Sequence, residues 1–190
     1  MPEINLTFER AVTKAMDYEV GAFNAADPET IQGLINTPAQ RKKVGYVNDP
    51  DDAGGETKYG VAHSGNPYIN IKTLDWAHAK QIYFERYWIA GGCDLLLSRI
   101  GILHFDGCTN HGIERASKFL QEVVGSQPDG HVGIITASKI TAENEISICN
   151  KVCDRRKKFY QDIVAAKPVQ VKYLKGWLRR IDEMCKFVAK

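Results

Sequence analysis

The sequence lacks any apolar run long enough to cross a lipid bilayer, and its first residues, Met1 to Leu6, lack the apolar core of a signal peptide. The first absence excludes a helical membrane protein, and the second leads us to expect synthesis in the cytoplasm. At 190 residues, 44% of them hydrophobic, the chain can bury one substantial core or form two small lobes that share an interface.

The five cysteines lack the spacing of a zinc-binding motif. Because five is an odd number, we expect buried free thiols as the main state of these side chains. Cys149 and Cys153 are placed to share a helix face, but the further ligands that a zinc site needs are not recognisable. We therefore predict no metal and no cofactor.

A segment rich in aspartate and glycine, Gly45–Gly60, lacks the glutamate that an EF-hand loop carries at its twelfth position. Turns are therefore favoured over a calcium site. The Asn-Asp-Pro of residues 48–50 is typical of the start of a turn, and Gly54-Gly55 permits positive φ. Tight turns or a small hairpin would hold the carboxylates of this segment in fixed positions.

A short helix is predicted before this loop, with Thr7 placed to cap it and Glu19 on its apolar face. A carboxyl group taken out of water resists ionisation and can act as a general acid, whereas a glutamate at a helix end often keeps its head in solvent. Glycoside cleavage commonly uses two carboxyl groups, and Glu19 with an aspartate of the loop would supply them. The apolar face consists of Phe8, Ala11, Val12, Ala15 and Met16.

Phe8 to Gly21, followed by GYVNDPDDAGGETKYGV from Gly45, resembles glycoside hydrolase family 108, a group of phage and prophage lysozymes. In that family a helix ends in Glu-Gly-Gly-Tyr and runs directly into Asn-Asp-Pro-x-Asp-Pro-Gly-Gly-x-Thr. Here an insertion of about two dozen residues splits the signature. An alignment without the insertion would put Lys43 in place of the acid and describe an inactive protein. We prefer the insertion because residues 37–43 lack an apolar stripe like the one before Glu19.

The periodicity predicts a mainly α protein with at most a small β-hairpin or loop near residues 45–62, and the resemblance implies that this fold is lysozyme-like. It also implies an N-acetylmuramidase that hydrolyses the β-1,4 bond between N-acetylmuramic acid and N-acetylglucosamine as a phage endolysin. The alternatives are a lytic transglycosylase on the same bond and a catalytically silent wall-binding phage protein. The implied catalytic residues are Glu19, Asp52 and Thr57, and the candidate substrate contacts are Tyr46, Tyr59 and Asp49.

Two neighbours of these residues leave alternatives open. Asp49 competes with Asp52 as the second carboxylate, although its place before Pro50 suits a turn. Glu56 is expected to face solvent, with the cleft as the alternative. The inserted stretch, about residues 23–44, could form a lid over the cleft or a surface ornament. Asp27 is placed to cap a short helix inside it, with a buried side made of Ile31, Leu34 and Ile35.

The second half of the sequence reads mainly as helices. Phe105 to Gly125 and the following PDGHVGIITASKI resemble the peptidoglycan-binding module that follows the catalytic part in this family. We expect Asp106 and Asn110 to cap or bridge helices at the interface between the two lobes. The expected organisation is a catalytic part at 1–92 and a binding-like part at 93–190, packed as one compact unit. One predicted helix starts at Thr73. The others cover about 95–105, 113–124, 134–140, 142–165 and 169–188.

The net charge of +2 conceals an uneven distribution. Residues 151–190 contain 12 Lys and Arg against 4 Asp and Glu, whereas residues 1–150 contain 13 against 19. A basic face could attract an anionic wall polymer or simply be solvated helix surface. It lacks a nucleic-acid reading motif, so we expect peptidoglycan as the partner, no nucleic acid, no stable membrane insertion and a monomer. By the resemblance, the protein would act on the cell wall or periplasm after release from the host cytoplasm.

Overall fold

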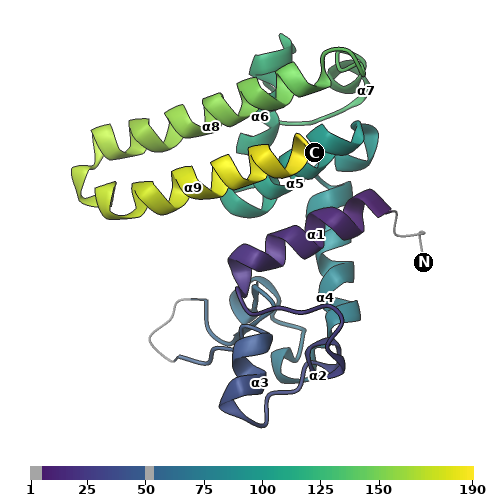
Figure 1. The fold of residues 1–190 in the computed structure, drawn as a ribbon, viewed down its shortest axis with the longest axis vertical. Coiled ribbons are helices and arrows are strands. Elements are labelled where there is room, and N and C mark those ends of the chain that lie inside the picture. Colours follow the sequence, from purple (N-terminus) through teal and green to yellow (C-terminus); the bar gives the residue numbers. More distant parts are fainter. Residues whose placement is uncertain (1–5, 50–53) are drawn as a thin grey trace. The chain divides into compact units, whose positions relative to one another are not determined.

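The computed structural model describes residues 6–49 and 54–190 (Figure 1). These residues are mainly helical, and an antiparallel hairpin of β1 (Thr57–Lys58) and β2 (Val61–Ala62) is their sheet. The predicted fold class, mainly α with a hairpin near residues 45–62, is confirmed. The chain divides into two compact units: one contains Val12–Phe84, and the other joins the start of the first helix, up to Ala11, to Glu85–Lys190.

The first unit contains short elements on either side of the hairpin. The predicted stripe of α1 is confirmed, because Phe8, Ala11, Val12, Ala15 and Met16 are all buried. The predicted cap is wrong: the helix already includes Thr7, whose hydroxyl donates to Ser98 Oγ at 3.4 Å. The helical elements are α1 (Leu6–Glu19), α2 (Pro28–Gln32), α3 (Pro38–Lys43), η1 (His63–Gly65), η2 (Ile71–Thr73) and α4 (Trp76–Tyr83).

The inserted stretch is folded, as α2 and α3. Asp27 caps α2 as predicted, because its carboxylate accepts the Glu29 N–H at 3.0 Å. The predicted buried side is wrong for Ile31, which is 40% exposed, and Thr30 is buried instead. The helix packs with Thr30 toward the buried Tyr59, whose hydroxyl donates to the Thr30 carbonyl.

Helix α3 forms although its sequence has no apolar stripe. Thr37 and Gln40 make a capping box, in which the Thr37 hydroxyl accepts the Gln40 N–H at 3.2 Å and the Gln40 side chain accepts the Thr37 N–H at 3.1 Å. At its other end, Lys43 forms ion pairs with Asp27 at 2.7 Å and Glu29 at 3.1 Å. Polar contacts within the insertion therefore hold this helix.

The second unit is helical throughout its regular elements. Its centre is α5, in which every residue from Ile100 to Cys108 is buried, as expected for a core helix. The predicted start at Leu95 is wrong, because residues 95–97 precede the helix and Leu95 is 46% exposed. The elements are the π-helical η3 (Phe84–Ile89), η4 (Cys93–Leu95), α5 (Ser98–His111), α6 (Ile113–Val124), α7 (Ile134–Ala137), α8 (Glu145–Ala166), η5 (Pro168–Gln170) and α9 (Val171–Val188).

Aromatic rings fill one side of the centre of this unit. Phe8, Trp88 and Phe105 pack edge to face or tilted, with centroids 5.6 to 5.9 Å apart. On the other side, α8 and α9 run side by side (Figure 1). Within the described residues, no helix is both long enough and apolar enough to cross a membrane.

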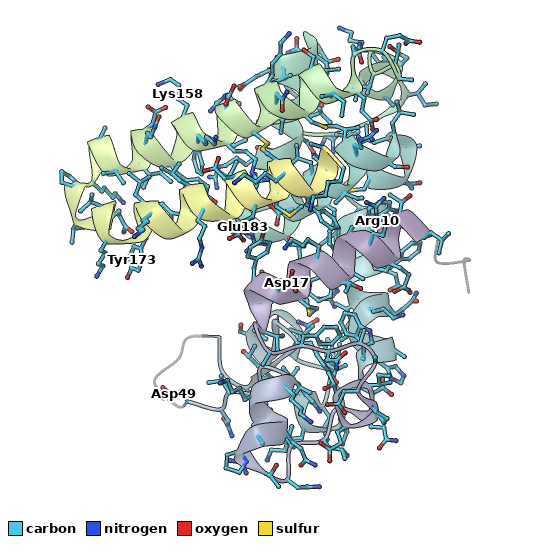
Figure 2. The ribbon with its side chains drawn as sticks, in the orientation of Figure 1. Arg10, Asp17, Asp49, Lys158, Tyr173 and Glu183 are labelled. Atoms are coloured by element: carbon cyan, nitrogen blue, oxygen red, sulfur yellow. A yellow bond between two sulfur atoms is a disulfide. The ribbon has the colours of Figure 1, made fainter. Side chains whose placement is uncertain are left out.

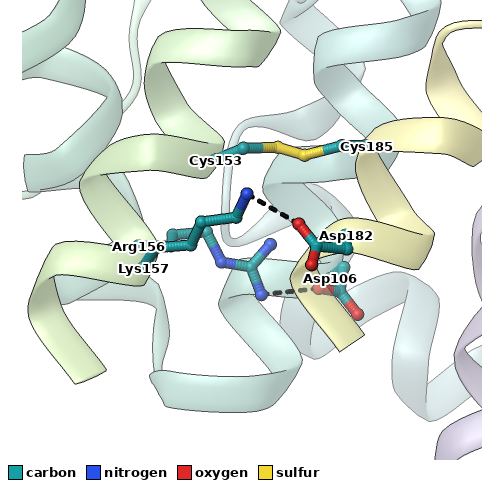
Figure 3. Close-up of a disulfide and its surroundings, with 6 residues drawn as sticks. All are labelled: Asp106, Cys153, Arg156, Lys157, Asp182 and Cys185. Atoms are coloured by element: carbon teal, nitrogen blue, oxygen red, sulfur yellow. Dashed lines mark hydrogen bonds and ion pairs between the residues drawn. A yellow bond between two sulfur atoms is a disulfide. The ribbon is translucent and has the colours of Figure 1, made fainter. Parts of the chain in front are cut away.

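A buried carboxylate joins α5 to α8 and α9. Asp106 accepts from Arg156 at 2.6 Å and from Arg180 at 3.0 Å (Figure 3 shows the Arg156 bond). Although burial alone would raise the pKa of Asp106, the two guanidinium groups hold it below its usual value. The predicted bridging of helices is confirmed for Asp106, and also for Asn110, which accepts from the Tyr160 hydroxyl at 2.5 Å. The predicted place, an interface between lobes, is wrong, because all these partners lie within the second unit.

A disulfide between Cys153 and Cys185 also joins α8 to α9, with a Cα–Cα distance of 6.6 Å (Figure 3). The expectation of free thiols is therefore wrong for this pair and confirmed for Cys93, Cys108 and Cys149, which are buried and free. An odd count requires only that one thiol stay free, so it does not exclude this bridge. The two partners are 32 residues apart in sequence, and only the packing of the two helices brings them together.

Asp106→Asn should destabilise the protein by about 3–5 kcal/mol, because it leaves two buried guanidinium groups without their carboxylate. The free energy of unfolding in urea measures this loss. Asp182→Asn is the matched control, since Asp182 pairs with Lys157 at 2.6 Å in an exposed position and its loss should cost about 1 kcal/mol or less. Equal losses in the two variants would contradict a special role for the buried carboxylate.

Candidate functional site

Glu19 is the last residue of α1, and the hairpin lies directly beside it. The helix ends there because the chain turns away at Gly21, which has a φ of 72°. A Cβ atom at Gly60 would lie 3.3 Å from Glu19 Cβ and 3.4 Å from its carboxylate Oε2. The turn between β1 and β2 therefore contacts Glu19. Its side chain is exposed, so the expectation that it turns inward is wrong: the apolar stripe ends at Met16.

The two halves of the split motif meet in space. Val20 packs against Gly45, where a Cβ would lie 3.2 Å from Val20 Cγ2. Gly45 has a φ of 59°, which favours glycine at this contact. The chain thus leaves after Glu19, folds as α2 and α3, and returns to the same place. Lys43, the residue that an alignment without the insertion puts at the acid position, instead pairs with Asp27 and Glu29.

The segment after the insertion extends the hairpin by a third, short pairing. Val47 and Thr57 exchange both backbone hydrogen bonds, at 3.0 and 2.8 Å, and Tyr59 donates its N–H to the Val44 carbonyl at 2.7 Å. Thr57 is half-buried, and its hydroxyl donates to the Gly55 carbonyl at 3.2 Å. These bonds fix Thr57 in the same hairpin that contacts Glu19.

The predicted aspartates fall differently. Asp49 is exposed in the first unit (Figure 2). Asp52 lies outside the described residues, so its role and its distance from Glu19 stay predictions.

Glu56 is half-buried and accepts the Tyr46 hydroxyl at 2.5 Å, so the expectation that it faces solvent is wrong. This hydrogen bond to Glu56, followed by burial, raises the pKa of Tyr46.

Tyr59 cannot serve as a substrate platform, which corrects the sequence prediction. Its side chain is 0% exposed, and its hydroxyl is bound to the Thr30 carbonyl. Burial raises the pKa of Tyr59. The ring packs against Trp76 at 5.6 Å and Phe23 at 6.3 Å, so it connects the hairpin to the insertion. Tyr46 remains the candidate aromatic contact beside the loop.

Sequence patterns gave no sign of a buried lysine in the hairpin. Lys58 is 0% exposed, and its Nζ donates to the Lys72 carbonyl at 2.8 Å. Gly33 of the insertion approaches it so closely that a Cβ there would lie 2.8 Å from Nζ. Burial lowers the pKa of Lys58 to about 8. Periodicity expects an apolar residue at an inward position of a strand, so it cannot predict that a lysine is buried there.

The second unit carries a groove of about 570 Å³ beside α6 and α8. Two guanidinium groups lie over its rings: Arg115 is 4.9 Å from the centre of Phe159, and Arg155 is 4.2 Å from the centre of Phe119. Cations and aromatic faces together can bind carboxylates and sugars. By contrast, Gln121, which lies in the stretch from Phe105 to Gly125, is structural, because its side chain binds the backbone and carboxylate of the turn at 129–131.

Two protein families and a solved structure are similar to this chain. Residues 40–112 match the Glycosyl hydrolase 108 family. Residues 115–182 match a family described as Predicted Peptidoglycan domain. The solved structure of SagA from Brucella abortus is similar to this chain with a TM-score of 0.68 and 25% sequence identity, over 96% of this chain and 94% of that one. No curated protein matches the chain significantly.

These matches support glycoside hydrolase activity directed at peptidoglycan. The first match begins at residue 40, so it contains the hairpin but not Glu19. An insertion between the two halves of a motif would interrupt such a match. The place of the N-terminal half of the site therefore rests on the close approaches of Glu19 to Gly60 and of Val20 to Gly45.

Lys58→Met should weaken the pH dependence of stability. The folded state gives up the Lys58 proton near pH 8, whereas the unfolded chain holds it to about pH 10.5. Between these values the unfolded state binds more protons, so the stability of the parent should rise with pH, by up to about 3 kcal/mol. Urea unfolding from pH 7 to 10.5 measures this rise.

The lysine-to-methionine variant keeps the apolar stem and lacks the titrating group, so this part of the rise should be absent. Lys72→Met, at an exposed neighbouring position, is the control and should keep the parental profile. If Lys58→Met also keeps it, other groups cause the rise.

Proposed function

We propose that the protein is an N-acetylmuramidase that hydrolyses the β-1,4 bond between N-acetylmuramic acid and N-acetylglucosamine in peptidoglycan, with Glu19 as the general acid. The observation that supports this best is the close approach of the exposed Glu19 carboxylate to the hairpin turn, where a Cβ at Gly60 would lie 3.4 Å from Glu19 Oε2. A general acid must reach the oxygen of the bond that breaks, and an exposed carboxyl beside a rigid hairpin can do so.

In the proposed reaction Glu19 gives its proton to the glycosidic oxygen as the bond to the anomeric carbon breaks. A water molecule attacks that carbon and passes its proton to a second carboxylate, for which we propose Asp52, with Asp49 as the alternative. We assign Thr57 to holding the water. Tyr46, oriented by its hydrogen bond to Glu56, is proposed to contact the sugar.

The second unit is proposed to hold the wall. Stem peptides of peptidoglycan carry carboxylates, which guanidinium groups bind well, and the groove places Arg115 and Arg155 over aromatic rings. The match to the Predicted Peptidoglycan domain includes both residues. We extend the proposal to a phage endolysin that acts on the wall after release from the host cytoplasm.

Glu19→Gln should reduce the rate of peptidoglycan solubilisation by at least about 100-fold, because the amide keeps the shape of the side chain but has no acidic proton to give. Release of soluble fragments from purified sacculi measures the rate.

Asp17→Asn is the matched control, since Asp17 lies on the same helix (Figure 2), is exposed and pairs with Lys14 at 2.8 Å. It should keep nearly the parental rate. A Glu19→Gln variant as fast as the parent would remove Glu19 from the mechanism. An inactive parent would favour the silent wall-binding alternative.

The released fragments distinguish hydrolysis from transglycosylation. Hydrolysis adds one water across the bond, so mass spectrometry in heavy-oxygen water should find the label at each new reducing end. A lytic transglycosylase instead closes a 1,6-anhydro ring on the muramic acid and takes up no water. Anhydro ends as the sole product would overturn the hydrolase assignment.

A further inference from the structure

Three side chains with metal-binding atoms meet in the core of the second unit, and none of them belongs to the proposed catalytic site. Cys93 begins η4, and His104 and Cys108 lie one turn apart on α5. Their side chains are 1%, 3% and 0% exposed. The sulfur and nitrogen atoms all lie within 4.8 Å of one another. The sequence concealed this group, because Cys93 lies eleven residues before His104 and joins it only through the fold.

The spacing fits a tetrahedral metal. Cys108 Sγ lies 3.5 Å from His104 Nε2. With metal–sulfur bonds of about 2.3 Å and metal–nitrogen bonds of about 2.0–2.1 Å, two ligands at a tetrahedral angle lie about 3.5 Å apart. The pair is thus already at the separation that the bound state requires, with no movement of α5.

Two of these side chains donate hydrogen bonds to backbone carbonyls. His104 Nε2–H donates to the Gly91 carbonyl at 3.0 Å, and the Cys93 thiol donates to the Tyr87 carbonyl at 3.7 Å. Gly91 sits so close that a Cβ there would lie 2.9 Å from Cys108 Sγ and 3.4 Å from Cys93 Sγ. Both sulfurs therefore lie beside Gly91, whose carbonyl accepts from the third member of the group.

We propose that Cys93, His104 and Cys108 bind a thiophilic divalent cation of the zinc class. On binding, each thiol loses its proton to solvent. The ring proton of His104 moves from Nε2, where it binds the Gly91 carbonyl, to Nδ1, and the Nε2 lone pair then binds the ion. Two thiolates neutralise the charge of the ion, so no net charge is buried. Three side-chain ligands leave the fourth position to water or to a main-chain carbonyl.

The bound ion would have a structural role and stabilise the second unit. It ties the turn at residues 90–93, which follows the π-helical η3, to the middle of the buried α5. The proposal does not depend on the muramidase assignment, because none of its ligands belongs to the hairpin site.

The test uses the intact chain with its Cys153–Cys185 disulfide formed, treated with a chelator and then titrated with Co²⁺ without oxygen. We expect one ion per chain and absorption bands of tetrahedral cobalt with thiolate-to-metal charge transfer. Zn²⁺ should displace the cobalt and raise the melting temperature. A parent protein that binds no cobalt, or binds it without thiolate bands, would overturn the proposal.

Cys108→Ser and His104→Asn should each weaken Co²⁺ binding by at least about 10-fold, the lower end of what loss of a metal-site group costs. Cys149→Ser is the matched control, since it removes a buried free thiol outside the group and should leave the titration unchanged. Equal binding by Cys108→Ser and the parent would overturn the assignment. If a variant fails to fold, the bands of the parent and the Cys149→Ser control still decide.

Thiol counting tests the redox alternative. The denatured parent, with its one disulfide, should show three reactive thiols. A count of one in protein kept from added oxidants would mean that Cys93 and Cys108 form a second disulfide, and the site would then be a redox pair instead of a metal site.

Discussion

The first unit depends on the close approach of other groups to two glycines. At Gly60 a Cβ would lie 2.6 Å from the Tyr83 hydroxyl oxygen, and that hydroxyl donates to the Tyr59 carbonyl at 2.9 Å. A side chain at this position would separate the hairpin from α4 and from the end of α1 together. Gly45 does the same for the point where the inserted stretch returns. The position of the proposed acid is therefore set by the absence of side chains as much as by their presence.

The second unit is held by a different physical principle. Its central helix is buried from Ile100 to Cys108, and the buried carboxylate of Asp106 on this helix is matched by cations from two other helices. Such a group favours one arrangement of α5, α8 and α9, because any other leaves a charge without its partner in a medium of low dielectric constant. Glu145 is a second buried carboxylate with partners on another helix, because it accepts the backbone N–H groups of Arg99 and Ile100 at the start of α5.

Sequence patterns predicted the features of the fold that depend on residues close together in the chain. The apolar stripe of α1, the Asp27 cap, the hairpin region and the long C-terminal helices follow from neighbouring residues and were predicted from sequence. The Tyr46–Glu56 bond, the buried Lys58 and the bridge between Cys153 and Cys185 join residues 10 or more positions apart, or reverse the usual polarity of a buried site. For Glu19, sequence indicated the right helix but the wrong exposure, because the stripe ends one turn before the helix does.

The bridge between α8 and α9 makes the stability of the second unit a function of its surroundings. Closing a loop of 32 residues lowers the entropy of the unfolded chain by an amount worth about 3–4 kcal/mol. In a reducing compartment this contribution is absent, and in an oxidising one it is present. The same chain is thus easier to unfold where thiols are kept reduced, and becomes harder to unfold, and harder for proteases to open, once it meets oxidising conditions.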